Sequence, residues 1–498
     1  MRGGYAMSSN TSVSAGRLSR KTLFAYGCGD FASNLTNTFM GSYLSIFYTD
    51  VVGLAPAVVA AIMVIARIWD AINDPMFGAI AERTNTKKGR FRPYIFYFTP
   101  FLALAAVLTF TTLGGKGGAV YAAITYIAYG MLYTVVNLSY GSLSTVMTTN
   151  PEDISQLTSW RMMGTNLSSV ILSALSPVIM GAISGSDTFT DQSYFITILI
   201  YAIFSIPLFY FVYANCKEVV KPVNEGQKVP LSMSLKTVVT NKPLMLVFAM
   251  MIFAMFAFFG RMGVVIYYII YVMQKPQYIS IFMSLPSIMT IVGIFLTKNY
   301  IVRWGKKKVT AIGYVGAGIS LILIYFVDPT NMVLMIALHA LYGFFCFSFP
   351  IPMSMIPEAI NYQEDRVGIR TDGLAYAATS LSTKVGNAFG PAIALLIMGA
   401  FGYVQNAQQT PEAMQGINLA ANLMFGICYL LALIPLFFYP LNAEKNAEIQ
   451  ASLDRKRDAR LAEKTSNVIV GMVRPGAARE KNQVRRSFVE TALQAEIK

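Results

Sequence analysis

Three charged residues stand close together in a stretch that is otherwise apolar enough to cross a membrane. The stretch ARIWDAINDPMFG carries Arg67, Asp70 and Asp74, spaced three and four residues apart. Residues at these spacings lie on one face of a helix. A charged residue at the centre of a membrane helix costs about 2.5–3.5 kcal/mol on insertion scales. The three charges can share this cost only on a face that points into a bundle of helices.

The chemistry of this face favours a positive ion. One basic and two acidic side chains leave a net negative charge, and Pro75 cannot donate a hydrogen bond to the carbonyl oxygen of Ala71, which is left free near the carboxylates. Oxygen ligands suit a hard cation such as Na⁺, and one carboxylate could carry a proton instead. A buried ion-pair network that only holds helices together is the remaining alternative. We predict Asp70 and Asp74 as the cation site and Arg67 as its supporting ion-pair partner.

Five further polar residues occur inside other apolar segments. Asp30 and Asn137 supply hydrogen-bond acceptors, whereas Arg161, Arg261 and Lys384 supply donors. Arg161 and Lys384 could pair with Asp30 and with the carboxylates described above, although Arg161 lies near a helix end and could also extend toward the membrane surface. Carboxylates accept from sugar hydroxyl groups, and Arg and Lys donate to hydroxyls or to a carboxylate. We predict that these five residues bind a neutral or anionic polyhydroxylated solute.

The composition is that of a membrane protein. Of the 498 residues, 55% are hydrophobic and 13% are charged, whereas a soluble domain averages about 25% charged residues. The net charge of +14 comes mostly from loops and the C-terminal tail, which indicates membrane topology rather than nucleic-acid binding. The four cysteines lie far apart and His339 is the only histidine, so we expect neither a disulfide framework nor a zinc site. We expect His339 to be a structural residue.

Twelve apolar segments are long enough to cross a bilayer, which takes about 20 residues. They are 23–48, 55–81, 94–113, 118–147, 160–184, 193–214, 243–272, 278–302, 309–327, 331–356, 373–402 and 414–440. Basic loops follow the even-numbered segments, so we expect both termini in the cytoplasm. The sequence predicts an all-α membrane protein with a cytoplasmic N-terminus 1–22, six-helix bundles 23–214 and 243–440, a cytoplasmic linker 215–242 and a cytoplasmic charged tail 441–498.

Two longer motifs resemble one known family. WDAINDPMFGAIAERTNTKKGRFRPY, beginning at Trp69, and EDRVGIRTDGLAYAATSLSTKVGNAFG, beginning at Glu364, are similar to signatures of the glycoside–pentoside–hexuronide:cation symporters. This branch of the major facilitator superfamily includes the bacterial melibiose carrier. YGCGDFASN and YTDVVGL are similar to the start of its members, and the resemblance covers residues 17–445. It implies cation-coupled glycoside symport by alternating access, without a cofactor, by a multi-pass protein of the bacterial inner membrane, which we expect to be a monomer.

The resemblance implies a cation site on two helices. The family's cation-site acids match Asp70 and Asp74, with Thr134 and Asn137 beside them. The melibiose carrier has an acid where this chain has Asn137 and a tryptophan where it has Gly141. Because one potential cation ligand has lost its charge, proton coupling is as open as sodium coupling, and Asp70 and Asp74 would be the metal ligands in the sodium case.

The resemblance also implies a sugar site. The family's sugar-recognising residues match Asp30, Arg161 and Lys384, while Gly29 stands where the melibiose carrier has a lysine. Other stretches look most like glucuronide carriers, with pentoside or xyloside carriers close behind. The lost acid at Asn137 would ease the binding of an anionic sugar, so a glucuronide or a pentoside is the expected substrate.

Other functions are weighed against transport of a glycoside. A membrane enzyme would need a nucleophile–base pair or a metal cluster, and no HExxH or GxSxG motif occurs. A carrier of lipid-like solutes would need a more apolar cavity with fewer buried charges. A sensor that binds without transporting is also compatible with the sequence, and only a flux measurement separates it from a symporter.

We predict different defects for the two kinds of acid. Asp74→Asn should abolish cation-dependent uptake, while some cation-independent exchange or binding remains, because the variant loses only the charge that holds the ion. Asp30→Asn should instead weaken sugar affinity under all ionic conditions. Uptake and binding assays check both, and undiminished concentrative uptake by Asp74→Asn would refute the cation role.

Overall fold

The structure is a computed structural model of the chain and describes residues 17–84, 86, 88–112, 118–148, 150–185, 189–219, 238–368 and 372–472. The expected N-terminus 1–22, linker 215–242 and tail 441–498 therefore lie partly outside the described residues. Within the described part the chain is almost entirely helical, apart from one isolated bridge between Thr86 and Gly89.

The N-terminal half forms six long helices. They are α1 Arg20–Ile46, which continues as the π-helical turn η1 Phe47–Val51, α2 Pro56–Arg83, α3 Arg92–Thr109, α4 Gly118–Met147, α5 Pro151–Ser184 and α6 Asp191–Asn215. Side chains cap several of their starts: Ser19, Asn150 and Thr190 each accept a backbone N–H of the first turn that follows them. Proline in the first turn of α2, α3 and α5 is tolerated because an N–H there has no intrahelical partner.

The C-terminal half is built from more pieces. They are α8 Lys242–Tyr267, η2 Tyr268–Val272, η3 Pro276–Tyr278, α9 Ile279–Phe326, α10 Met332–Phe345, η4 Cys346–Ser348, α11 Ile351–Val367, α12 Asp372–Ala400, α13 Pro411–Asn418, η5 Leu419–Leu423, α14 Met424–Leu431, α15 Leu433–Phe438 and α16 Ala443–Met472. α9 contains two membrane segments, because Gly305 leaves the helical conformation with φ 78° and kinks the chain. Two other membrane segments each combine several short helices: one runs from α10 to α11, and the other runs from α13 to α15.

The expected number of spans agrees with the helices observed. Among the described residues, 11 stretches are long and apolar enough to cross a membrane. The twelfth long helix is α1, in which glycine, serine, threonine and asparagine residues lower the hydropathy. Of its 27 residues 18 are nevertheless buried, because α1 packs against α5, α6 and α8. The twelve-helix all-α architecture is therefore confirmed, whereas the cytoplasmic position of the termini stays a prediction.

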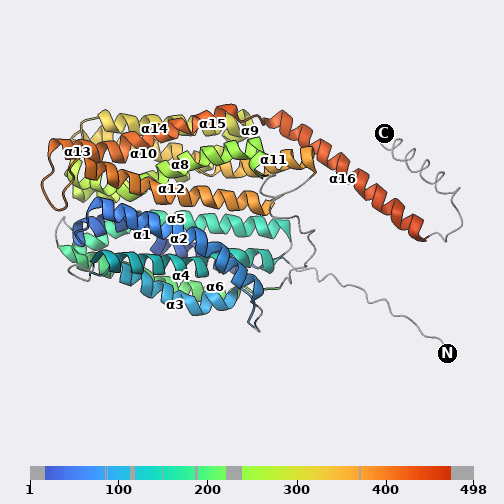
Figure 1. The fold of residues 1–498 in the computed structure, drawn as a ribbon, viewed down its shortest axis with the longest axis horizontal. Coiled ribbons are helices and arrows are strands. Elements are labelled where there is room, and N and C mark those ends of the chain that lie inside the picture. Colours follow the sequence, from blue (N-terminus) through green and yellow to red (C-terminus); the bar gives the residue numbers. More distant parts are fainter. Residues whose placement is uncertain are drawn as a thin grey trace.

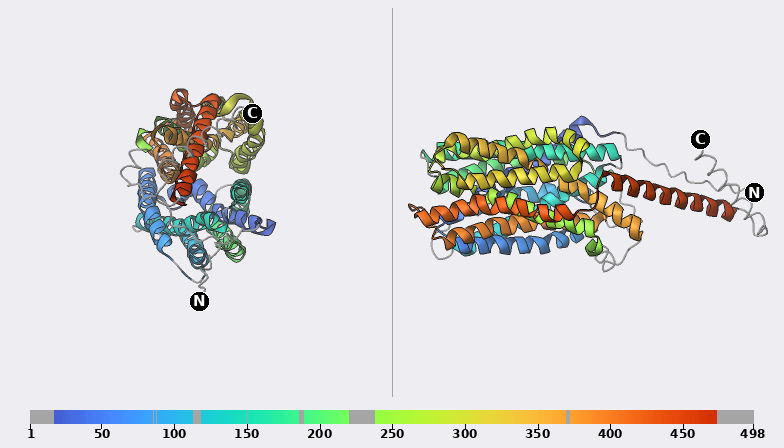
Figure 2. Two further views of the ribbon diagram at one scale, coloured as in Figure 1. Left: turned by 90° about the vertical axis from the view of Figure 1, so that its right-hand side faces the viewer. Right: turned by 90° about the horizontal axis from the view of Figure 1, so that it is seen from above.

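The helices form two halves that lie side by side. Figure 1 shows α1–α6 in one half and α8–α15 in the other, with α16 extending beyond one end. Figure 2 gives the same arrangement from the end and from above. The halves touch through α1 with α8, α2 with α12, and α5 with α9. The start of α16 is held by Asp365 of α11, which accepts a hydrogen bond from Ser452 and pairs with Lys456.

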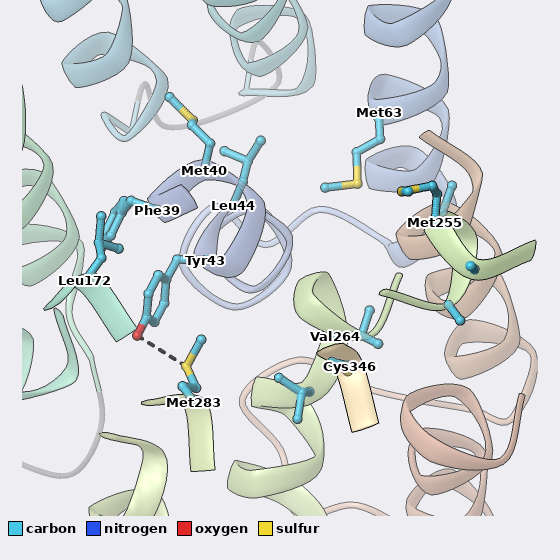
Figure 3. Close-up of a cluster of buried hydrophobic side chains, with 14 of the residues drawn as sticks. Phe39, Met40, Tyr43, Leu44, Met63, Leu172, Met255, Val264, Met283 and Cys346 are labelled. Atoms are coloured by element: carbon cyan, nitrogen blue, oxygen red, sulfur yellow. Dashed lines mark hydrogen bonds between the residues drawn. The ribbon is translucent and has the colours of Figure 1, made fainter. Parts of the chain in front are cut away.

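Apolar side chains from both halves meet in one core (Figure 3). The hydroxyl group of Tyr43 on α1 donates to the sulfur atom of Met283 on α9 at 3.3 Å. Met63 of α2 and Met255 of α8 belong to the same buried cluster. Thioether side chains are flexible and polarizable, so this surface can stay packed while the halves change position.

A polar contact joins the halves at the end opposite the α6–α8 connection. The carboxylate of Asp50 in η1 accepts hydrogen bonds from the hydroxyl groups of Tyr271 and Tyr403, which both belong to the C-terminal half. The backbone oxygen of Asp50 accepts from the side chain of Asn406. Asp50 thus links the two halves at this end of the molecule.

The turn after α2 is fixed at the other end of the molecule. The carboxylate of Glu218, which follows α6, accepts from the backbone N–H groups of Arg90, Phe91 and Arg92 at 2.7, 2.8 and 3.0 Å. A carboxylate at the first turn of α3 satisfies otherwise unpaired N–H groups and complements the helix dipole. Gly89 allows this approach, since a Cβ atom there would lie 2.6 Å from Glu218 Oε1.

We predict that Asp50→Asn opens the end at which Asp50 links the two halves. Asparagine presents one acceptor oxygen instead of two and carries no charge, and a hydrogen bond to a charged group contributes about 1.5–3 kcal/mol. Spin labels at Val58 and Val404, both exposed at this end, should show longer distances in double electron–electron resonance. Asp328→Asn is the matched control, because the carboxylate of Asp328 accepts hydrogen bonds only from Thr330 among the described residues. Identical distance distributions in Asp50→Asn and the parent protein would contradict this linking role.

Candidate functional site

The charged residues of α2 form the contacts that their spacing indicates. Arg67 Nη1 lies 3.0 Å from Asp70 Oδ2, and Arg67 Nη2 donates to the hydroxyl group of Tyr126 on α4 at 2.8 Å. The guanidinium carbon also lies 5.7 Å from the centre of the Tyr126 ring. The ion pair expected for Arg67 is therefore present, and an aromatic residue supports it.

A second ion pair joins the two halves. Lys384 Nζ on α12 contacts Asp74 Oδ2 on α2, and it lies 3.4 Å from the carbonyl oxygen of Asp70. Thr134 of α4 donates to the other carboxylate oxygen, Asp74 Oδ1, at 2.9 Å. The carboxylate of Asp74 is therefore shared between the N-terminal and the C-terminal half.

The contact with Lys384 changes the net charge that the sequence indicates for the charged group of α2. Arg67 and Lys384 supply two positive charges against the two negative charges of Asp70 and Asp74, so this group is neutral, not net negative, when all four residues are ionised. The side chains of Lys384 and Asp74 are 23% and 26% exposed. Neither side chain is therefore fully enclosed by the protein.

One carboxylate oxygen of this group has no hydrogen-bond partner. Asp70 Oδ1 is buried and unpartnered among the described residues, and it lies against Gly130, where a Cβ atom would come within 2.6 Å of it. Buried acceptors are normally satisfied, so this oxygen is available to a proton or a metal ion. The described residues contain no cluster of three or more His, Cys, Asp or Glu side chains. An ion bound here would depend on two carboxylates and neutral oxygen atoms.

A third ion pair lies within the N-terminal half. Arg161 of α5 donates from Nε to Asp30 Oδ2 at 2.6 Å and from Nη2 to Asp30 Oδ1 at 3.3 Å. Two parallel bonds of this kind fix both orientation and distance. The guanidinium carbon lies 5.1 Å from the centre of the Tyr140 ring. Arg161 is thus directed at Asp30 instead of the membrane surface, and its side chain remains 34% exposed.

Gly29 makes room for this arrangement. The Tyr140 ring packs against it so closely that a Cβ atom at Gly29 would lie 2.2 Å from Tyr140 Cε2. The hydroxyl group of Tyr140 donates to the carbonyl oxygen of Tyr26 at 2.6 Å, which fixes the ring. A lysine, as in the melibiose carrier, cannot stand at this position while Tyr140 keeps its place.

The two α4 residues predicted for the cation point to different partners. Thr134 reaches Asp74, as described above, but Asn137 Oδ1 accepts from the hydroxyl group of Ser33 on α1 at 3.3 Å. Asn137 therefore lies beside the helix that carries Asp30, which suits its predicted substrate role better than its predicted cation role.

Three tyrosines of α4 also belong to this region, although their residue type alone does not predict a role. Tyr126 supports Arg67 and Tyr140 supports Arg161, and Tyr133 stands midway between them. A spacing of seven residues places all three on one face of the helix. This heptad spacing of tyrosines is the sequence signal that identifies them.

Arg261 does not join these residues. It is 3% exposed inside the C-terminal half and donates to Asn422 Oδ1 at 3.3 Å, so the geometry gives no support to its predicted substrate role. His339 is structural, as expected: its Nδ1 bonds the carbonyl oxygen of Met335 at 2.8 Å, and its ring packs on Phe282. All four cysteines are free, also as expected.

We predict that Gly29→Ala weakens sugar binding. The added methyl group must displace Tyr140, and overpacking of this kind costs about 1–3 kcal/mol. Because Tyr140 supports Arg161, glycoside affinity should fall about tenfold in titration calorimetry. Gly78→Ala is the matched control, since a Cβ atom at Gly78 meets nothing within 4 Å. Unchanged affinity in Gly29→Ala would show that Tyr140 does not position the arginine.

Comparisons with known proteins identify the family. The sequence profile described as MFS/sugar transport protein matches residues 25–443. The symporter YnaJ of Bacillus subtilis (strain 168), itself uncharacterized, is 31% identical, and the match covers 86% of this chain and 94% of that protein. The glucuronide carrier protein homolog of Escherichia coli (strain K12) is 29% identical, over 89% of this chain and 97% of its own length.

A solved structure has a similar fold. The bacterial homolog of the human lysosomal transporter Spinster, in an inward-facing and unoccupied conformation, superposes with a TM-score of 0.63 and covers 87% of this chain and 97% of its own. At 12% identity this likeness concerns the fold alone. The profile match and the YnaJ match carry the assignment: this chain belongs to the MFS/sugar transport proteins, as one of the glycoside–pentoside–hexuronide:cation symporters, and is a multi-pass membrane transporter and not an enzyme.

Proposed function

We propose that this protein carries a glycoside together with a proton or a sodium ion, and that the coupling ion competes with Lys384 for Asp74. One observation carries the proposal. Asp74 is bonded to Thr134 in the N-terminal half and to Lys384 in the C-terminal half. An ion that replaces one of these bonds changes how the two halves are held together.

The charge balance supports competition. Because Arg67, Lys384, Asp70 and Asp74 sum to zero, an additional cation is favourable only when Lys384 leaves Asp74. Asp74, the hydroxyl group of Thr134 and the unpartnered Oδ1 of Asp70 offer the ion its oxygen atoms. Ion binding and release of Lys384 are then a single event.

The released ammonium group favours an anionic sugar. Asp30 and Arg161 offer an acceptor and a donor for sugar hydroxyl groups, and Lys384 adds a positive charge that can pair with a sugar carboxylate. Asn137 beside Ser33 adds no negative charge that would repel it. We therefore place hexuronides such as glucuronides before neutral pentosides as substrates.

The transport cycle is alternating access. Asp50 links the two halves at the end opposite the α6–α8 connection, so in this conformation sugar and ion would exchange through the other end, which is cytoplasmic in the topology that the sequence predicts. Coupling between two ligands of one protein is typically about 1–3 kcal/mol. We place the protein in a bacterial inner membrane, where it works as a monomer without a cofactor.

We predict opposite effects of Lys384→Met on the two ligands. Without the ammonium group the partly buried carboxylate of Asp74 loses its counter-charge and keeps only the hydrogen bond from Thr134, and removal of one partner of such a pair leaves a charge that favours a cation. Affinity for the coupling ion should therefore rise about tenfold or more in cation titrations, whereas glycoside uptake should be lost. Lys456→Met, which removes a lysine of α16 paired with Asp365, should change neither. Unchanged ion affinity in Lys384→Met would refute the competition.

Transport itself is tested in proteoliposomes. Uptake of a glucuronide and of a neutral pentoside is measured separately under a sodium gradient and under a proton gradient. We expect one gradient to drive concentrative uptake of the glucuronide. Strong competition by pentosides with none by glucuronides would overturn the substrate class, and binding without flux would identify a sensor.

A further inference from the structure

Arg261 of α8 is a buried cation without an acidic partner. It is 3% exposed, and none of the ion pairs among the described residues includes it. A guanidinium group stays protonated in proteins, and a buried charge without a counter-charge is strongly unfavourable. Arg67 and Arg161, by contrast, each have a carboxylate partner.

The contacts of Arg261 are all with neutral groups. Nη2 donates to Asn422 Oδ1 at 3.3 Å, and the guanidinium carbon lies 4.5 Å from the centre of the Tyr342 ring. The buried Nε has no partner among the described residues. An amide and a ring face orient the guanidinium, but they do not neutralise it.

Two π-helical turns adjoin this position. Tyr268 begins η2, which continues α8 directly, and Asn422 belongs to η5, which packs against α8. The hydroxyl group of Tyr268 is buried and unpartnered among the described residues. Tyr268 follows Arg261 by seven residues and so lies on the same face of the helix, where it is influenced by the charge of Arg261 and by that of the exposed carboxylate of Asp328. π-helical turns are rare and occur frequently at functional sites. Two unpartnered donors, an N–H and an O–H, thus lie beside an uncompensated positive charge.

The titratable groups around Arg261 do not supply the missing charge. His339 Nδ1 donates to the carbonyl oxygen of Met335, so in the neutral ring Nε2 carries a lone pair, and this atom is also buried and unpartnered. The remaining neighbours on which Arg261 acts are the tyrosine hydroxyl groups of Tyr342 and Tyr429 and the thiol of Cys346. None of these groups needs to be an anion in the folded protein.

A series of amides leads from Arg261 toward one end of the bundle. Asn422 Nδ2 donates to Asn418 Oδ1 at 2.9 Å, and Asn418 Nδ2 donates to the carbonyl oxygen of Tyr325 at 3.0 Å. Tyr325 stands next to the last residue of α9. The series offers a small ion polar partners between the end of α9 and the guanidinium group.

We infer that Arg261 and Tyr268 bind a small monovalent anion, with chloride as the probe, inside the C-terminal half. The anion accepts from Arg261 Nε–H and from the hydroxyl group of Tyr268, and its charge neutralises the guanidinium. This site is separate from the sugar and cation site on α1, α2 and α5. Its role is to stabilise the packing of η5 on α8.

Thermal unfolding of the purified full chain tests this inference. Sodium chloride is compared with sodium methanesulfonate at equal ionic strength, because a ligand that binds only the folded state raises the melting temperature. We expect a saturable rise of about 2–5 °C in chloride. Arg261→Met should show no such rise, and it should melt in methanesulfonate no lower than the parent protein, since apolar replacement of an uncompensated charge is neutral or stabilising.

Asn422→Asp provides a second variant that keeps Arg261. It places a carboxylate where Asn422 Oδ1 now lies, 3.3 Å from Arg261 Nη2, and so supplies the counter-charge from within the chain. We expect this variant to be stable and insensitive to chloride. Arg366→Met is the matched control: Arg366 also lies over a tyrosine ring, Tyr362, but at the surface, and its loss should leave the chloride response unchanged.

Crystals soaked in bromide locate the anion directly. We expect an anomalous peak beside Arg261 Nε. No chloride response in the parent protein would mean that only water satisfies these groups, and a response that survives in both Arg261→Met and Asn422→Asp would place the anion elsewhere. Either result, or a bromide peak only at other positions, would overturn the inference.

Discussion

The need to neutralise charge inside a membrane governs this structure, and the pair of Asp74 and Lys384 is where that need connects the two halves. Each group alone is expensive in a low-dielectric interior, and together they satisfy each other only across the boundary between α2 and α12. The relative position of the halves is therefore tied to what occupies Asp74. Thr134 holds the other oxygen of the same carboxylate, so Asp74 stays in place when its partner changes.

The remaining boundary is suited to movement. Met63, Met255 and Met283 contribute to the buried core that both halves share, and methionine side chains repack at small energetic cost. Directional bonds concentrate at Asp50, where two tyrosines and an asparagine of the other half converge. A boundary with few directional bonds and an adaptable apolar surface can change between two arrangements without breaking the core of either half.

The sequence predicted the features that depend on a single helix, but it predicted fewer of the contacts that join two helices. Hydropathy located the spans, and the spacing within α2 predicted the contact of Arg67 with Asp70, because backbone geometry fixes neighbours three or four residues apart. The pairing of Lys384 remained one option among several, since sequence spacing carries no information across helices. The sequence grouped Arg261 with the substrate residues because of its charge alone. In the structure α8 packs against α14 and η5, and the side chain of Arg261 donates to Asn422 of η5.

The two halves differ in how their buried charges are balanced. In the N-terminal half, Arg67 and Arg161 each combine a carboxylate with a tyrosine ring of α4, and Asp74 adds a further negative charge. The C-terminal half contributes the positive charges of Lys384 and Arg261, besides the pair of Lys306 and Glu358, which balance each other within that half. Lys384 lies at the boundary and finds its counter-charge in the opposite half. Arg261 lies too deep to do so, because its neighbours all belong to its own half. The two cations of this half thus have different surroundings: Lys384 pairs with a carboxylate of the opposite half, whereas Arg261, among the described residues, contacts only neutral groups of its own half.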